Sequence, residues 1–287
     1  MPASRSRTER WRDCLNQIHA RNGGVEFAID HAPAQAGEIE TPDVMWRVRV
    51  LAVTEKEMLV ERPSALTQPF DLAPGVSVVV VMSIGQNRWM FRSRVAGLPG
   101  DPPNPFRTRI GGLRLSLPDS VERCSRREFM RTNVASLTLP RVEGFPILDP
   151  TSVAPAEAAN EALYTAHLLG GTTWQEGSHL PMPVVGPCFT AQLMNLGGGG
   201  VGLLVDKTES GAVDRARYLW LRLHLPPHLP APLCVVGKAV HTHMDSEQNL
   251  YVGVAFDFAL NTSHQSFVIE QMRRYAERIQ GGRTQAA

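Results

Sequence analysis

Short runs in which apolar and polar residues alternate fill the chain between residues 25 and 117. An apolar residue at every second position is the pattern of a strand with one buried face. In the run 46–50, a tryptophan and two valines alternate with two arginines, and the runs 88–95 and 113–117 repeat the pattern. Prolines and glycines separate these runs at short intervals. The region is therefore predicted to be an antiparallel meander or a small barrel.

The same texture returns between residues 189 and 258. Its clearest run is 218–225, in which leucines occupy every second position. A helical pattern follows, because apolar residues recur at i, i+4, i+7/8 and i+11 from Val268 to Ile279. Two glycines, at 281 and 282, are expected to end this helix. The second half is thus predicted to be a small antiparallel barrel with a C-terminal helix, which either closes the barrel end or mediates dimer contacts.

A shorter helix is predicted near the N-terminus, at 9–20. Trp11, Leu15 and Ile18 fall on one face of it at i, i+4 and i+7. The residues Arg21-Asn-Gly-Gly24 would stop it, since glycine is favoured just past a helix end. The helix is marginal without packing, and it is either a docking helix or a lid.

Residues 141–187 fit neither pattern, because they are rich in proline, alanine, glycine and threonine. We expect them to form an insertion with one helix at 155–169. The insertion is an excursion over the surface, a partner-binding element or a poorly ordered loop. The predicted boundaries are 1–24 for a tail and helix, 25–118 for an N-terminal β-rich domain, 119–131 for an arginine-rich junction and 132–287 for a second β-rich domain.

The composition is globular, with 43% hydrophobic and 20% charged residues in 287 positions. The formal net charge is only +1, which argues against a general DNA-binding protein. The four cysteines form no CxxC pair, so neither a structural zinc site nor a disulfide framework is indicated. No run approaches the roughly 18–20 apolar residues of a membrane span. We expect a soluble, cytoplasmic protein.

Arginines gather at the junction between the two β-rich regions. Arg126, Arg127 and Arg131 lie within six residues, and Arg123 precedes them. Guanidinium groups stay charged, bind phosphate and guanine edges bidentately, and stack on flat rings. The cluster is either an anion clamp or a solvated charged linker.

A glycine-rich stretch, Asn195-Leu-Gly-Gly-Gly-Gly200, separates two predicted strands. Without side chains, its backbone N–H groups can approach a ligand closely, and such turns can form anion-binding concavities. Asn195 adds an amide that can pair with a base edge. Taken alone, the stretch is equally well a plain hairpin turn.

Together the two stretches resemble the PilZ domain, whose motifs are RxxxR and (D/N)xSxxG. Arg127 and Arg131 match the first motif, and Arg126 is the arginine that often precedes it. Asn195 and Gly200 match the ends of the second. The resemblance covers about residues 123–280.

Two further positions bear on this resemblance. The run 252–256 is similar to the final strand of the family, in which a glycine, here Gly253, precedes an aromatic residue. The motif serine is replaced by Gly197, so one hydroxyl hydrogen bond is missing. That loss costs about 0.5–1.5 kcal/mol of binding free energy where water does not replace it.

The resemblance implies a six-stranded antiparallel barrel and the ligand cyclic di-GMP. With the β-rich region upstream, the chain is similar to the two-domain flagellar brake receptors. Such a receptor would rearrange its domains on binding and control motility or exopolysaccharide output through a flagellar motor or polysaccharide-synthesis protein. The expected ligand-binding residues are Arg123, Arg126, Arg127, Arg131, Asn195, Gly197, Gly198, Gly199, Gly200 and Gly253.

Other function classes are less well supported. A PilZ-like scaffold that acts only through protein contacts is the alternative, and Gly197 favours it. An enzyme is not indicated, because the chain has no Walker loop and no Gly-x-Ser-x-Gly elbow. His241 and His243 share one face of a predicted strand without carboxylates at ligand spacing, so we expect solvent-facing histidines and no metal or cofactor.

Overall fold

The computed structural model describes residues 10–30, 43–65, 68–84, 87–98, 111–124, 139–170, 180–197, 199–213, 216–244 and 248–281. These residues form two compact units, which divide near residue 138. Both units are mainly β, as predicted. Within the described residues, no helix has the length and apolar character needed to cross a membrane.

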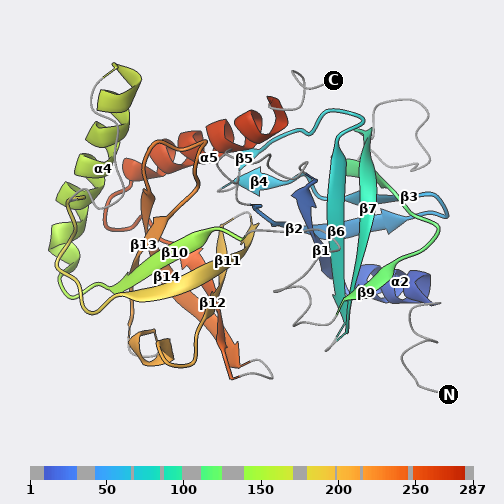
Figure 1. The fold of residues 1–287 in the computed structure, drawn as a ribbon, viewed down its shortest axis with the longest axis horizontal. Helices are drawn as coiled ribbons and strands as arrows, with labels where there is room; N and C mark the ends of the chain where they lie inside the picture. The colour runs from blue at the N-terminus through green and yellow to red at the C-terminus, as the bar shows by residue number, and fades with distance from the viewer. Residues whose placement is uncertain are drawn as a thin grey trace, which may run out of the picture. The chain divides into compact units, whose positions relative to one another are not determined.

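The N-terminal unit is a closed antiparallel barrel (Figure 1). Its strands are β1 (Gly24–Ile29), β2 (Trp46–Val53), β3 (Glu57–Val60), β6 (Ser77–Ile84), β7 (Asn87–Gly97) and β8 (Leu113–Ser116). They pair in the order β2-β1-β6-β7-β8-β3, and β3 returns to β2. The short β9 (Glu122–Cys124) adds to β7, and β4 (Ser64–Ala65) pairs with β5 (Gln68–Pro69). The barrel prediction for this region is confirmed.

Helix α2 (Trp11–Ala20) packs against β2 of this barrel. Its buried residues are Trp11, Leu15 and Ile18, which are the three that the helical spacing selects. The Trp11 ring lies 5.9 Å from that of Phe91, a residue of β7. The helix is therefore held by its apolar face, which a segment this short requires.

The C-terminal unit is a second closed barrel. Its strands are β10 (Arg141–Pro146), β11 (Phe189–Gly197), β12 (Gly200–Val205), β13 (Leu219–Leu223), β14 (Leu233–Met244) and β15 (Leu250–Phe256). They pair in the order β10-β11-β12-β15-β14-β13, and β13 closes onto β10. Helix α5 (His264–Gly281) follows and buries Val268, Met272 and Tyr275. This confirms the predicted six-stranded antiparallel barrel with a C-terminal helix.

The first barrel strand differs from the prediction. Residues 141–146 were assigned to the insertion, but they form β10, which pairs with β11 and β13 and closes the barrel. Residues 125–138 lie outside the described part. Gly144 interrupts the apolar-polar alternation by which a strand is recognised in the sequence. The Phe189 ring packs over Gly144 and leaves no room for a side chain, since a Cβ there would lie 2.0 Å from the ring.

The insertion between β10 and β11 carries the 3-10 turn η1 (Pro150–Ser152) and helix α4 (Val153–Leu168). A second 3-10 turn, η2 (Ser210–Ala212), follows β12. The predicted helix at 155–169 is confirmed, with bounds two residues and one residue earlier, and the alternative of a poorly ordered loop for 141–187 is wrong for this helix. Val153 and Ala156 join a buried cluster with Trp220 and Val236 of the barrel.

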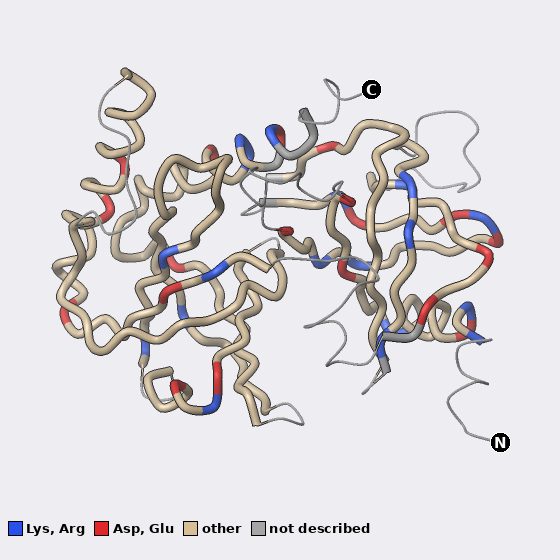
Figure 2. Tube along the Cα trace, in the orientation of Figure 1, with Lys and Arg blue, Asp and Glu red and all other residues tan. Residues whose placement is uncertain are grey.

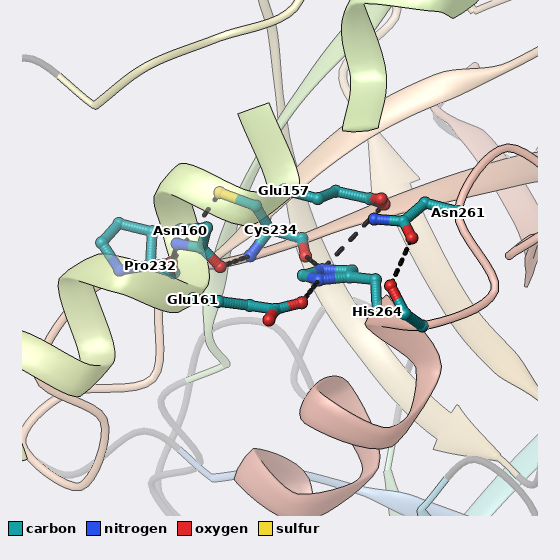
Figure 3. Close-up of polar contacts among 8 residues, drawn as sticks. Glu157, Asn160, Glu161, Pro232, Cys234, Asn261 and His264 are labelled. Carbon is teal, nitrogen blue, oxygen red and sulfur yellow. Dashed lines mark hydrogen bonds and ion pairs between the residues drawn. The ribbon is translucent and has the colours of Figure 1, made fainter. Parts of the chain in front are cut away.

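Polar side chains of α4 also pair with the start of β14 (Figure 3). The Asn160 amide donates to the Pro232 carbonyl at 3.0 Å and accepts from the Cys234 N–H at 3.1 Å. The Tyr164 hydroxyl donates to the Ala231 carbonyl at 2.6 Å. These side chains satisfy buried backbone groups that would otherwise cost stability, so α4 completes the end of β14.

His264 links α4, α5 and β14 (Figure 3). Its Nε2 lies 2.9 Å from the Cys234 carbonyl, and its Nδ1 lies 2.7 Å from a Glu161 carboxylate oxygen. Glu157 lies nearby, 1% exposed, and burial raises its pKa although His264 opposes the shift.

Candidate ligand-binding site

The arginine side of the predicted site lies outside the described residues. Arg126, Arg127 and Arg131 fall in the segment 125–138, and their contribution stays a prediction. The backbone at Arg123 belongs to β9, opposite Trp89 of β7 in the N-terminal barrel. Gly198 is also not described. The structure does describe the rest of the glycine-rich side.

The stretch from Asn195 to Gly200 is a hairpin rather than a six-residue turn. Gly197 pairs with Gly200 and Asn195 pairs with Gly202, so only residues 198 and 199 connect the strands. The predicted turn is wrong in this respect, because strand pairing extends into the glycines. Asn195 and Gly200 therefore lie on strands β11 and β12, whose pairing fixes their positions.

Four residues lie directly opposite one another across four neighbouring strands of the barrel. The row runs from β11 through β12 and β15 to β14 and consists of Asn195, Gly202, Gly253 and His241. Directly opposite residues share one face of a sheet. The adjacent Leu203 and Val252 are fully buried, so the row lies on the outer face. Its two central glycines, Gly202 and Gly253, form a band of backbone without side chains of its own, which we call the glycine strip; the His241 ring lies over Gly253.

Two bulges re-aim side chains toward this face. The register of β11 shifts between Leu193 and Asn195, and that of β14 shifts between Ala239 and His241. One extra residue moves every later side chain to the opposite face. As a result Asn195 faces outward beside the glycine strip. The exposed Lys238, opposite Ala255 on the neighbouring strand, lies on the same face and supplies a cation there.

Tyr251 lies on the glycine strip and was not predicted as a site residue. A Cβ at Gly202 would lie 2.2 Å from its hydroxyl oxygen. The Asn195 Nδ2 donates to this hydroxyl at 3.0 Å. Asn195 is 5% exposed and Tyr251 is 9% exposed, so the two polar groups are buried together. The sequence could have indicated Tyr251 as a site residue, because it lies two positions before Gly253 in the same strand and therefore on the same face of the sheet.

Two histidine rings flank Tyr251. His243 lies opposite it with ring centroids 4.7 Å apart, and His241 lies diagonally with centroids 6.1 Å apart. Both histidines are exposed, which confirms the predicted solvent-facing pair. Among the described residues, no three His, Cys, Asp or Glu side chains are close enough to hold a metal ion. The arrangement instead presents flat aromatic rings beside bare backbone.

The glycines of the hairpin differ in their surroundings. A Cβ at Gly200 would lie 2.0 Å from the Val254 carbonyl oxygen, so this glycine is needed for the approach of β15. A Cβ at Gly197 or Gly199 would meet nothing within 4 Å in the part of the chain that is described. A serine side chain at position 197 therefore fits the available space.

Charges elsewhere on the C-terminal barrel neutralise one another. Basic and acidic positions occur close together along its trace (Figure 2). Glu143 of β10 pairs with Arg222 at 3.1 Å and with Arg141 at 3.0 Å. Both arginines therefore form ion pairs with the same carboxylate. A ligand phosphate on the outer face would depend on Lys238 and on the arginine-rich junction.

No protein-family model matches the chain, and no curated protein matches its sequence. Solved structures do match, each over most of both chains. The inhibitor of motility MotI/DgrA of Bacillus subtilis is 12% identical, with 89% of this chain and 97% of that chain covered and a TM-score of 0.29. YcgR of Escherichia coli in complex with c-di-GMP is 11% identical, with 96% and 92% covered and a TM-score of 0.27. MrkH of K. pneumonia in its apo state is 8% identical, with 94% and 95% covered and a TM-score of 0.29. Such TM-scores carry no conclusion about function.

Proposed function

We propose that the chain is a receptor for cyclic di-GMP, which binds on the outer face of the C-terminal barrel. One observation carries the proposal. The asparagine and final glycine of the second motif lie on the second and third strands of a closed six-stranded barrel, and the arginine motif precedes the first strand. The position of the second motif and the chain order of the first support the PilZ resemblance.

The chemistry of the ligand suits the residues. Cyclic di-GMP carries two phosphates and two guanines. Arg127 and Arg131 can bind phosphate oxygens or guanine O6 and N7, and Asn195 offers one donor and one acceptor to a base edge. Gly202 and Gly253 have no side chains of their own, so a flat base that displaces the Tyr251 phenol and the His241 ring would reach the backbone there. Lys238 adds positive charge at the edge of the same face.

The proposed role is to bind and respond, without a chemical step. We propose that the ligand favours one arrangement of the two barrels, which requires it to bind that arrangement more tightly. The output would be motility or exopolysaccharide synthesis, through a cytoplasmic partner protein or a second copy of the chain. X-ray scattering with and without cyclic di-GMP would detect the rearrangement.

Calorimetry with purified protein tests the binding. We expect one saturable transition with cyclic di-GMP, and none with cyclic GMP or a short oligonucleotide. Arg131→Ala should abolish it. Arg92→Ala is the matched control, because Arg92 is an exposed arginine of the N-terminal barrel that pairs with Asp30. Unchanged affinity in Arg131→Ala would refute the assignment.

A second candidate is a PilZ-like scaffold that binds no nucleotide. Two observations favour it: Asn195 is buried against Tyr251, and Gly197 offers no hydroxyl. A ligand that binds only the folded state raises the melting temperature. The scaffold therefore predicts no thermal shift with cyclic di-GMP at any concentration, and the receptor predicts a concentration-dependent rise.

A further inference from the structure

Tyr251 occupies the place from which a ligand would reach Asn195. Its hydroxyl accepts a hydrogen bond from the Asn195 amide at 3.0 Å. The same oxygen would lie 2.2 Å from a Cβ at Gly202, so the tip of the phenol rests on the glycine strip. With Asn195 only 5% exposed, a base edge cannot pair with this amide while the phenol stays in place.

We propose that Tyr251 is a gate of this site, and that a guanine base displaces its phenol from the glycine strip and takes over the Asn195 amide. The inference rests on the proposed function, because it assigns a residue to the same ligand. The inference goes beyond the proposed function because it identifies the Tyr251 side chain as the group that competes with the ligand in the free protein. Tyr251 is thus a residue that sets affinity and specificity.

The surroundings of the phenol restrict what can replace it. The strip is flat, since Gly202 and Gly253 carry no side chains; the His241 ring lies over Gly253, and the His243 ring packs against Tyr251. A planar group therefore fits where the phenol lies and gains stacking contacts there. A purine base meets this requirement.

The Asn195 amide adds a second restriction. A buried amide that loses its partner carries a desolvation cost, so the incoming group must replace the tyrosine hydroxyl with its own hydrogen bonds. Guanine offers both donors and acceptors on its edges, whereas an apolar ring offers none. Opening the gate thus selects for a base that can pair with Asn195.

A purely structural role for Tyr251 predicts something different from a gate. In both cases, Tyr251→Phe removes one buried hydrogen bond and lowers stability. A gate also competes with the ligand, and its loss raises the fraction of binding-competent protein. Removing one hydrogen bond from the closed state should then tighten ligand binding roughly three- to tenfold.

The experiment is calorimetry with cyclic di-GMP on the full chain, Tyr251→Phe and the matched control Tyr218→Phe, which lies elsewhere in the same unit. Circular dichroism confirms that each variant is folded. Tighter binding by Tyr251→Phe alone, including binding by this variant where the unmodified chain shows none, supports the gate. Equal or weaker binding by Tyr251→Phe than by the unmodified chain overturns the gate and leaves the proposed function standing. No binding by any of the three overturns both.

Discussion

Gly200 lies where the backbones of β12 and β15 come close together, so the substitution Gly200→Ala tests whether this close approach contributes to stability. A Cβ built there lies 2.0 Å from the Val254 carbonyl oxygen and 2.9 Å from the Ala255 Cα. Both atoms belong to the backbone of β15, so no side-chain rotation relieves the clash. Gly200→Ala therefore forces the two strands apart by about 1 Å at this end, because non-bonded carbon and oxygen atoms need roughly 3 Å or more.

The loss of unfolding free energy in Gly200→Ala has two contributions. Overpacking of this kind typically costs about 1–3 kcal/mol, and one weakened ladder hydrogen bond adds about 1 kcal/mol. Gly200 lies beside the hairpin turn, where the backbone can relax, so we expect a loss of roughly 2–3 kcal/mol. With a urea m-value of about 2 kcal/mol/M, the unfolding midpoint of the C-terminal unit falls by roughly 1–1.5 M.

Urea unfolding followed by circular dichroism and by hydrogen exchange of the β12 and β15 amides measures this loss. Gly197→Ala and Gly199→Ala are the controls, since a Cβ at either position meets no described atom within 4 Å. We expect their midpoints to stay within about 0.5 M of the unmodified chain. If Gly200→Ala unfolds at the same midpoint as these controls, the strand-approach reasoning is wrong. A stability loss in Gly200→Ala would also mean that any loss of binding there reports on the fold and not on a ligand contact.

Two further predictions concern a missing hydroxyl and a buried carboxyl. Gly197→Ser should tighten cyclic di-GMP binding by up to roughly tenfold, because its hydroxyl can form one more hydrogen bond to the ligand. Gly197→Ala should show no gain in affinity by calorimetry. Equal affinities of the serine and alanine variants would contradict the prediction. Burial raises the pKa of Glu157, so the folded state binds its proton more tightly than the unfolded state. Stability from this carboxyl is therefore complete below its unfolded pKa of about 4.3 and is lost as pH rises through the folded pKa. Glu157→Gln should gain melting temperature relative to the unmodified chain between pH 4 and pH 8, and a pH-independent difference would contradict this.

The strands of both barrels were largely predictable, because a closed barrel with a buried interior imposes period-2 alternation. The run 218–225 is one such case, and the structure has β13 within it. β10 escaped prediction for a physical reason. Gly144 and Pro146 interrupt its alternation, and Gly144 is explained only by the Phe189 ring that packs over it from the next strand. A contact between strands separated by a long insertion leaves no local trace in the sequence.

The site was predictable in its residue types but not in its geometry. Asn195 and Gly200 were selected by their spacing, yet their neighbours Gly202 and Tyr251 depend on the pairing of β12 with β15. That pairing is a long-range property, because side-chain facing changes with each one-residue shift in register. The bulge after Leu193 is such a shift, and no glycine or proline at that point marks it.

The two bulges also bear on the choice between receptor and scaffold. Bulges also occur in the N-terminal barrel, after Val50 and after Val95, so their presence alone does not separate the two candidates. What bears on the choice is which side chains the bulges turn outward. Here the bulge in β11 turns Asn195 to the outer face, and the bulge in β14 turns His241 to the same face, where its ring covers Gly253. Lys238 precedes the second bulge and faces the same side in regular register. An amide, an imidazole ring and a cation thereby lie around the glycine strip. Tyr251 fills that surface and satisfies the amide in the free protein. The arrangement is thus complete with the phenol in place, and the proposed receptor requires that a guanine which displaces the phenol satisfies the Asn195 amide equally well.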